Sequence, residues 1–227
     1  MKIIFVIPSK YSEQDFYEKA PIAKSLKPFQ SKLLELMVYP NGNQNLSGVF
    51  NHAIENSGSD GGDIFVFCHD DFYILDFYWI DRLLEGLGKY DVVGIAGNSE
   101  RISMQPSWLF KDINLNSFNV NTLSGIVAHG TSLPSQHLSI YGPPDQEVEI
   151  LDGIFLGMTR ATIDKHALSF DETFAYDFYD LDFCRLARSK NLKLGTIPIS
   201  VMHESGGKFN TQQWRNSYLD YIKKWGD

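Results

Sequence analysis

The chain has 227 residues, of which 43% are hydrophobic and 21% are charged, and this ordinary globular composition excludes disorder as the dominant state. Its formal net charge of -8 argues against nucleic acid or an anionic membrane as partner, and an anionic substrate would need a bridging cation. Cys68 and Cys184 fall inside predicted regular elements and suggest no disulfide, which is typical of a reducing, cytoplasmic compartment.

The first part of the sequence alternates strand and helix patterns. Residues 3–7 form a short β-branched and aromatic run that predicts a buried parallel strand, and the run is too short for a signal peptide or a membrane span. Residues 22–36 carry apolar side chains near helical spacing and predict a helix. The other elements expected here are strands at 36–39, 63–68 and 92–96 and helices at 46–56 and 77–86.

The second part begins with a change of pattern. Residues 98–150 contain four prolines and many Asn and Ser residues, with short strand candidates at 125–129 and 147–150, and predict a partly antiparallel insertion within one domain. The remaining elements expected are helices at 160–168, 179–190 and 211–225 and a strand at 192–202. Strands that alternate with helices predict an α/β fold with a mostly parallel central sheet.

His69, Asp70 and Asp71 directly follow the strand expected at 63–68. In open α/β sheets, ligands bind beyond the carboxyl ends of the strands. Carboxylates there suit Mg²⁺ or Mn²⁺, and such an ion can in turn hold phosphate oxygens. The structural alternative is that the two acids cap the next segment or are merely solvated.

Three further positions could carry chemistry, and each also has a structural interpretation. Asp180 is either a general base or, with Asp182, part of an acidic first turn that suits the helix dipole. His203 precedes a glycine-containing loop and is a candidate ligand, although a lone histidine is usually structural. Asp152 and Gly153 lead an apolar segment that could otherwise be an edge strand.

The order of these features resembles the inverting glycosyltransferases of family 2, which have the GT-A fold. The features are the acidic triplet at 69–71, Asp-Gly at 152–153, Phe-Asp-Glu-x-Phe at 170–174, Tyr-Asp-x-Asp-x-Cys at 179–184, and the late His203. The chain is most similar to the small glycosyltransferase-like branch in which His-x-Asp replaces Asp-x-Asp. The resemblance extends from residue 3 to about residue 207 and is weakest over 98–150.

The resemblance implies a donor site and a metal site. Asp71 would bind a divalent Mn²⁺ or Mg²⁺ on the diphosphate of a nucleotide-diphospho-sugar, and His203 would complete the metal site. His69 stands where the first acid of the motif normally lies and would be the third metal residue. Asp70 would lie near the ribose or the diphosphate, and Pro8 and Ser9 near the nucleotide base.

The resemblance also implies how transfer would occur. Asp180 would deprotonate the hydroxyl of a saccharide or other acceptor, and Asp152 with Gly153 would line the acceptor or sugar pocket. Residues 1–227 would form one domain: a nucleotide-sugar-binding half at 1–97, an acceptor-binding half at 98–210 and a C-terminal helix at 211–227. A hexosyltransferase is expected, and a homo-oligomer is compatible with the sequence.

Two alternatives to this enzyme keep the same fold. One is a sugar-nucleotide-binding or nucleotidyltransferase-like protein without glycosyl transfer, which the missing first acid at position 69 favours. The other is a non-catalytic family member that acts as a binding partner. The presence of Asp71, Asp180 and His203 together argues against the second alternative.

Overall fold

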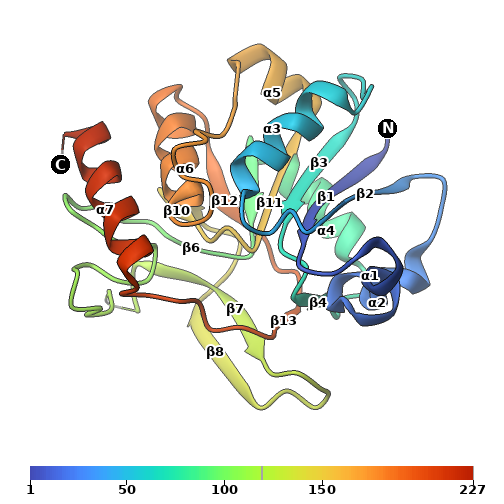
Figure 1. Cartoon of the computed structure of the whole chain (residues 1–227), viewed down its shortest axis with the longest axis horizontal. Helices are drawn as coiled ribbons and strands as arrows, with labels where there is room; N and C mark the ends of the chain where they lie inside the picture. The colour runs from blue at the N-terminus through green and yellow to red at the C-terminus, as the bar shows by residue number, and fades with distance from the viewer. Residues whose placement is uncertain (119, 227) are drawn as a thin grey trace.

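The computed structural model describes residues 1–118 and 120–226, which form two sheets covered by helices (Figure 1). The main sheet has the strand order β2-β1-β3-β11-β5-β12-β9. Its strands are β1 (Ile3–Ser9), β2 (Leu34–Pro40), β3 (Ile64–Cys68), β5 (Val92–Gly94), β9 (Glu147–Val148), β11 (Phe155–Thr159) and β12 (Leu194–Thr196).

The second sheet has the order β10-β6-β7-β13-β4, and β8 pairs with β7 outside that path. Figure 1 shows the β7–β8 hairpin projecting at the bottom of the view, away from the helices above the main sheet. The strands are β4 (Phe72–Ile74), β6 (Ala96–Asn98), β7 (Leu123–His129), β8 (His137–Gly142), β10 (Ile150–Leu151) and β13 (Val201–His203).

The helices pack on the main sheet and along its edges (Figure 1). They are α1 (Glu13–Lys19), α2 (Pro21–Leu26), the short 3₁₀ helix η1 (Lys27–Phe29), α3 (Leu46–Asn56), α4 (Trp79–Leu87), α5 (Arg160–His166), α6 (Tyr179–Ser189) and α7 (Gln212–Trp225). Within residues 1–118 and 120–226, none of these helices combines the length and the apolar composition that crossing a bilayer requires.

The predicted α/β fold is confirmed, and its main sheet is mixed. Strands β1, β2 and β3 are parallel to one another, and so are β5 and β12. Strand β11 runs antiparallel to both β3 and β5 and joins these two parallel groups. Every side chain of β1 and β3 is buried, because helices cover both faces of this part of the sheet. The antiparallel part of the fold is therefore larger than the small elaboration expected from the sequence.

The helix predicted at 22–36 is present only in its first part, and its predicted length is wrong. Helix α2 ends at Leu26, one 3₁₀ turn containing Pro28 follows, and β2 begins at Leu34. Proline lacks the N–H that a helix interior needs, and its ring obstructs the preceding turn. The apolar residues beyond it serve the sheet instead, since Leu34 pairs with Ile3 in the first register position of the parallel pair β1–β2.

Two strands expected as single runs are each divided between the two sheets. Residues 92–96 belong to β5 and then to β6, and residues 192–202 contain β12 and then β13, with Pro198 between them. Each chain segment leaves the main sheet after three residues and then joins the second sheet. These two crossings place the second sheet against the carboxyl end of β3.

Candidate active site

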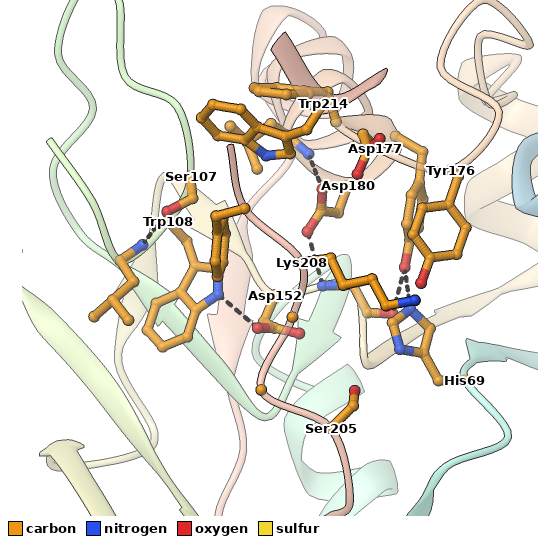
Figure 2. Close-up of a pocket in the computed structure, with 18 of the residues that line it drawn as sticks. His69, Ser107, Trp108, Asp152, Tyr176, Asp177, Asp180, Ser205, Lys208 and Trp214 are labelled. Carbon is orange, nitrogen blue, oxygen red and sulfur yellow. Dashed lines mark hydrogen bonds between the residues drawn. The ribbon is translucent and has the colours of Figure 1, made fainter. Parts of the chain in front are cut away.

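A cavity of about 220 Å³ lies beside the carboxyl end of β3 (Figure 2). Its walls come from segments that are far apart in the sequence: His69 and Asp71, residues 106–109, the turn at 152–153 before β11, and residues 176–181 at the start of α6. The loop at 205–209 also lines it. His203 lines it as well, so the fold brings together residues from all four regions singled out in the sequence: 69–71, 152–153, Asp180 and His203.

His69, Asp71 and His203 form a cluster whose ligand atoms all lie within 4.8 Å of one another. The Nε2 atom of His203 is 3.2 Å from Asp71 Oδ1, and Nδ1 of His69 is 3.7 Å from the same oxygen. Strand β13 creates this proximity, because its antiparallel pairing with β4 sets His203 opposite Phe72, the neighbour of Asp71. Three residues separated by up to 134 positions thus converge as the sequence predicted.

Tyr179 determines which nitrogen of His69 faces this cluster. The Tyr179 hydroxyl donates its only proton to the carbonyl of Gly153 at 2.8 Å, and its oxygen lies 2.9 Å from Nε2 of His69. The oxygen can then only accept, so Nε2 of His69 carries the proton. The opposite nitrogen, Nδ1, is left with a free lone pair directed at the side of Asp71, which is the arrangement of a metal-ligating histidine.

The electrostatics of the cluster keep Asp71 ionised. Burial favours the neutral carboxyl, but the hydrogen bond with His203 and the charges of both histidines outweigh it and hold the pKa of Asp71 well below its ordinary value. Burial lowers the pKa of His69 further than Asp71 can raise it, which favours the neutral ring. For His203, burial lowers the pKa, and the bond with Asp71 more than offsets this and raises it. An anionic carboxylate next to imidazoles is a donor set suited to a divalent cation.

Asp180 lies in the first turn of α6, and its carboxylate faces the cavity (Figure 2). One carboxylate oxygen accepts from the N–H of Gly153 at 3.0 Å, and the other from the N–H of Leu181 at 2.9 Å. Burial, with the nearby charge of Asp152, raises the pKa of Asp180 to about 7, although the two backbone bonds act in the opposite direction. A carboxylate with this pKa can take a proton near neutral pH.

The turn at 152–153 connects these groups. Asp152 accepts a 2.5 Å hydrogen bond from Nε1 of Trp108 and a 2.8 Å bond from the N–H of Ile154. Gly153 packs so closely on α6 that a Cβ atom there would lie 2.1 Å from the Tyr179 hydroxyl. Only glycine fits this position, and the requirement comes from space rather than from a special backbone conformation.

Three of the predicted donor residues lie outside the cavity lining. Ser9 donates a 2.6 Å hydrogen bond from its hydroxyl to Asp70, and the same Asp70 oxygen accepts from the N–H of Lys10 at 3.0 Å. Pro8, Ser9 and Asp70 are all buried. Asp70 thus fastens the loop after β1 to the end of β3, and a direct contact of these three residues with a nucleotide stays a prediction.

Asp182 lies in the acidic first turn of α6, as the structural interpretation of the sequence predicted, and it has a further structural role. The residue is 1% exposed, and its side chain binds Nζ of Lys224 and, at 2.8 Å, Nε1 of Trp225. It therefore attaches α7 to α6 and does not face the cavity. Asp180 and Asp182 are two residues apart, which places them on different sides of the helix.

Several cavity residues were missed in the sequence: Tyr179, Trp108, Trp214, Lys208 and Ser205. Tyr179 stands inside the Tyr-Asp-x-Asp stretch, so the motif itself was a usable signal. Lys208 and Ser205 flank Gly206 and Gly207, and a glycine-containing loop after a strand is a second such signal. No signal in the sequence pointed to Trp108 or Trp214, because their neighbours in the cavity come from distant parts of the chain.

No family model and no curated protein sequence matches the chain. Solved structures do resemble it. A197 from STIV has a TM-score of 0.51 at 15% identity over 90% of this chain and 86% of that one. The catalytic domain of Drosophila beta1,4galactosyltransferase 7, in a complex with xylobiose, has a TM-score of 0.52 at 14% identity over 96% of this chain and 79% of that one.

A third similar structure is GalNAc-T7 with UDP, GalNAc and Mn²⁺. Its TM-score is 0.54 at 10% identity, and the match covers 98% of this chain but 48% of that one. Identities this low carry information on the fold alone. The agreement across nearly the whole length of the chain shows that it has the GT-A glycosyltransferase fold.

Proposed function

We propose that this protein is an inverting glycosyltransferase that moves a sugar from a nucleotide-diphospho-sugar to an acceptor hydroxyl with the help of a divalent metal ion. The observation that carries the proposal is the presence of two complementary groups in one cavity. A donor set for a cation, His69, Asp71 and His203, shares the cavity with Asp180, a carboxylate whose pKa is about 7.

The residues present fit a divalent cation. Nδ1 of His69 has a free lone pair, Asp71 is ionised, and Nε2 of His203 is directed at the same carboxylate. Two imidazoles with one carboxylate favour Mn²⁺ over Mg²⁺, which prefers oxygen ligands and retains its waters. The bound ion would neutralise the charge that develops on the leaving diphosphate. The histidine at position 69 therefore does not weaken the case for metal binding, since it offers a ligand atom of its own.

Asp180 would act as the general base. Its oxygens are oriented by the N–H groups of Gly153 and Leu181, and it would take the proton of the acceptor hydroxyl as that oxygen attacks C1 of the donor sugar. The bond from C1 to the diphosphate oxygen breaks as the new bond from C1 to the acceptor oxygen forms. One displacement of this kind inverts the configuration at C1. Lys208, which lines the same cavity, would add positive charge near the diphosphate.

We also propose that the domain divides into a nucleotide-sugar-binding half at 1–97 and an acceptor-binding half at 98–210. His69 and Asp71 come from the first half and Asp152 and Asp180 from the second, and the metal residue His203 also comes from the second. The protein named GalNAc-T7 was solved with UDP and Mn²⁺, and this combination guides the choice of the first donors to be tested. We propose a hexosyl group as the transferred sugar.

The test is a thermal-shift screen of UDP- and GDP-sugars with Mn²⁺ or with EDTA, because a ligand that binds only the folded protein raises its apparent stability. We expect stabilisation by at least one nucleotide sugar with Mn²⁺, little with EDTA, and no difference between the two for Asp71→Ala. Equal binding with EDTA, or no binding to any nucleotide sugar, would refute the proposal. Tight binding without transfer to any acceptor would favour a sugar-nucleotide-binding protein. NMR of the anomeric proton in the product distinguishes inversion from retention.

A further inference from the structure

Two tryptophans stand on the side of the cavity away from the metal cluster. Figure 2 shows Trp108 and His69 on opposite sides of Asp152 and Asp180, with Trp214 next to Asp180. If the donor diphosphate is held by the metal cluster, an acceptor hydroxyl has to approach Asp180 from the other side. The surface that it meets there is formed by the two indole rings and by Asp152.

Both indole rings are held rigidly. Trp108 donates from Nε1 to Asp152 at 2.5 Å, its carbonyl accepts from Nδ2 of Asn98 at 2.9 Å, and its ring meets Tyr141 edge-on with centroids 4.8 Å apart. Trp214 stacks on Tyr218 with an interplanar angle of 6°. Rings fixed in this way lose little side-chain freedom when a ligand covers them, which favours binding.

The cavity is lined mainly by acidic rather than basic side chains. Asp152, Asp177 and Asp180 line it, and Lys208 is the one Lys or Arg side chain among the described residues that line the whole cavity. An acceptor that carried a phosphate or a carboxylate would face three acidic side chains with Lys208 as the one cation of the described lining to offset them. A neutral acceptor meets no such repulsion.

Taking the proposed glycosyl transfer as its basis, we infer that Trp108, Trp214 and Asp152 form an acceptor subsite for a neutral saccharide. A sugar ring presents an apolar face of C–H groups that packs on an indole, and hydroxyl groups at its edge that donate to carboxylates. Asp152 accepts from one hydroxyl and thereby places a neighbouring hydroxyl at Asp180. The ring of Trp108 contacts the sugar and also orients Asp152 through their mutual hydrogen bond.

The four tryptophans of the chain allow a direct test on the intact protein. Trp79 is fully buried and Trp225 binds Asp182, and neither lines the cavity, so their indole N–H signals serve as internal controls. Each of the four signals in a ¹H–¹⁵N spectrum is assigned by a single Trp→Phe substitution. The probes are methyl β-D-glucopyranoside, cellobiose, lactose and maltose, with glycerol 3-phosphate and glucose 6-phosphate as anionic counterparts.

We expect at least one neutral sugar to shift the Trp108 and Trp214 signals and to leave those of Trp79 and Trp225 in place. The phosphorylated compounds should shift neither pair. A response to the phosphorylated compounds alone, or no response of Trp108 and Trp214 to any of the neutral sugars, would overturn the inference. This titration needs neither donor nor metal. Shifts by a neutral sugar in a protein that binds no nucleotide sugar would therefore uphold the subsite while the transfer proposal fails.

Kinetics with an active donor provide the second measurement. Trp108→Phe keeps an aromatic ring but removes the bond to Asp152, and Trp214→Leu removes the second ring; each should raise the acceptor KM at least 10-fold. Trp225→Phe is the matched control and should leave the acceptor KM unchanged. A calorimetric titration with UDP in the presence of Mn²⁺ shows whether each variant is folded. An unchanged acceptor KM in both folded variants would contradict the subsite.

Discussion

The hydroxyl of Tyr179 lies 2.9 Å from Nε2 of His69, and this contact connects the metal cluster to the start of α6. The same hydroxyl donates to the carbonyl of Gly153, and the N–H of Gly153 donates to Asp180. Tyr179 thus binds the carbonyl of Gly153, and the next residue, Asp180, binds its N–H. The contacts of this one glycine therefore position both His69, the proposed metal ligand, and Asp180, the proposed base.

Tyr179→Phe tests this connection. The substitution removes the acceptor that holds the proton on Nε2 of His69, so Nδ1 is no longer reserved for a metal, and we expect Mn²⁺ affinity to fall by about 10- to 100-fold. It also leaves the buried carbonyl of Gly153 without that donor, at a cost of about 1–3 kcal/mol in the free energy of unfolding. Calorimetric titration with Mn²⁺ and urea unfolding measure the two effects.

The matched control for that variant is Tyr78→Phe, because Tyr78 is 67% exposed and lies outside the cavity lining. It should retain the Mn²⁺ affinity and the stability of the original protein. An unchanged Mn²⁺ affinity in folded Tyr179→Phe would show that the tyrosine does not position His69.

Asp180→Asn should lower the transfer rate by at least about 10²-fold and leave Mn²⁺-dependent UDP binding intact, because the amide cannot take the acceptor proton. With the original residue, the base is active only when ionised. Since the pKa of Asp180 is about 7, kcat should rise with pH through about 7 and level off above it. Transfer assays from pH 5.5 to 9 give this profile. A rate that persists in the variant, or that falls as pH rises through 7, would rule out this base.

The same carboxyl should affect stability in the opposite sense. Its pKa is raised in the folded protein, so between the ordinary value of 3.8 and about 7 the folded state holds more protons than the unfolded state. The contribution of Asp180 to stability is therefore present in acid and is lost as pH rises through this window, by at most about 1.4 kcal/mol per pH unit. Urea unfolding at several pH values should show a downward slope relative to Asp180→Asn. Parallel curves would mean that Asp180 titrates normally.

Gly153→Ala should displace both Tyr179, which positions the metal ligand His69, and the proposed base Asp180. The new Cβ would lie 2.1 Å from the Tyr179 hydroxyl and 3.0 Å from Cβ of Asp180, so α6 has to move away from the turn. We expect a loss of about 1–3 kcal/mol in stability, as for other overpacked positions, together with weaker Mn²⁺ binding and slower transfer. Gly61→Ala is the control, since its Cβ meets one neighbour at 3.9 Å, and it should change none of these three properties. Full activity in Gly153→Ala would show that the turn tolerates displacement.

The sequence by itself determined those helices and strands whose spacing of apolar residues matches the side chains that are buried in the fold. Residues 64–68 form an uninterrupted apolar run and are a buried strand, and residues 46–56, with Asn45 as the N-cap, are the helix that their pattern predicted. His69, Asp71 and His203 were recognisable as polar residues directly after predicted strands, Asp152 as the residue before an apolar segment, and Asp180 as an acid at the start of a predicted helix. The structure brings all five to one cavity.

Only the tertiary structure decided how these residues face one another. Asp70 and Asp71 are adjacent in sequence and have the same side chain, yet one binds Ser9 and the loop after β1 while the other faces His203. Likewise, Asp180 faces the cavity and Asp182 holds α7. The direction of each side chain depends on which distant strand or helix packs beside it. The pairing of β13 with β4, the packing of Gly153 on Tyr179 and the position of Trp108 are long-range contacts, and no local pattern encodes them.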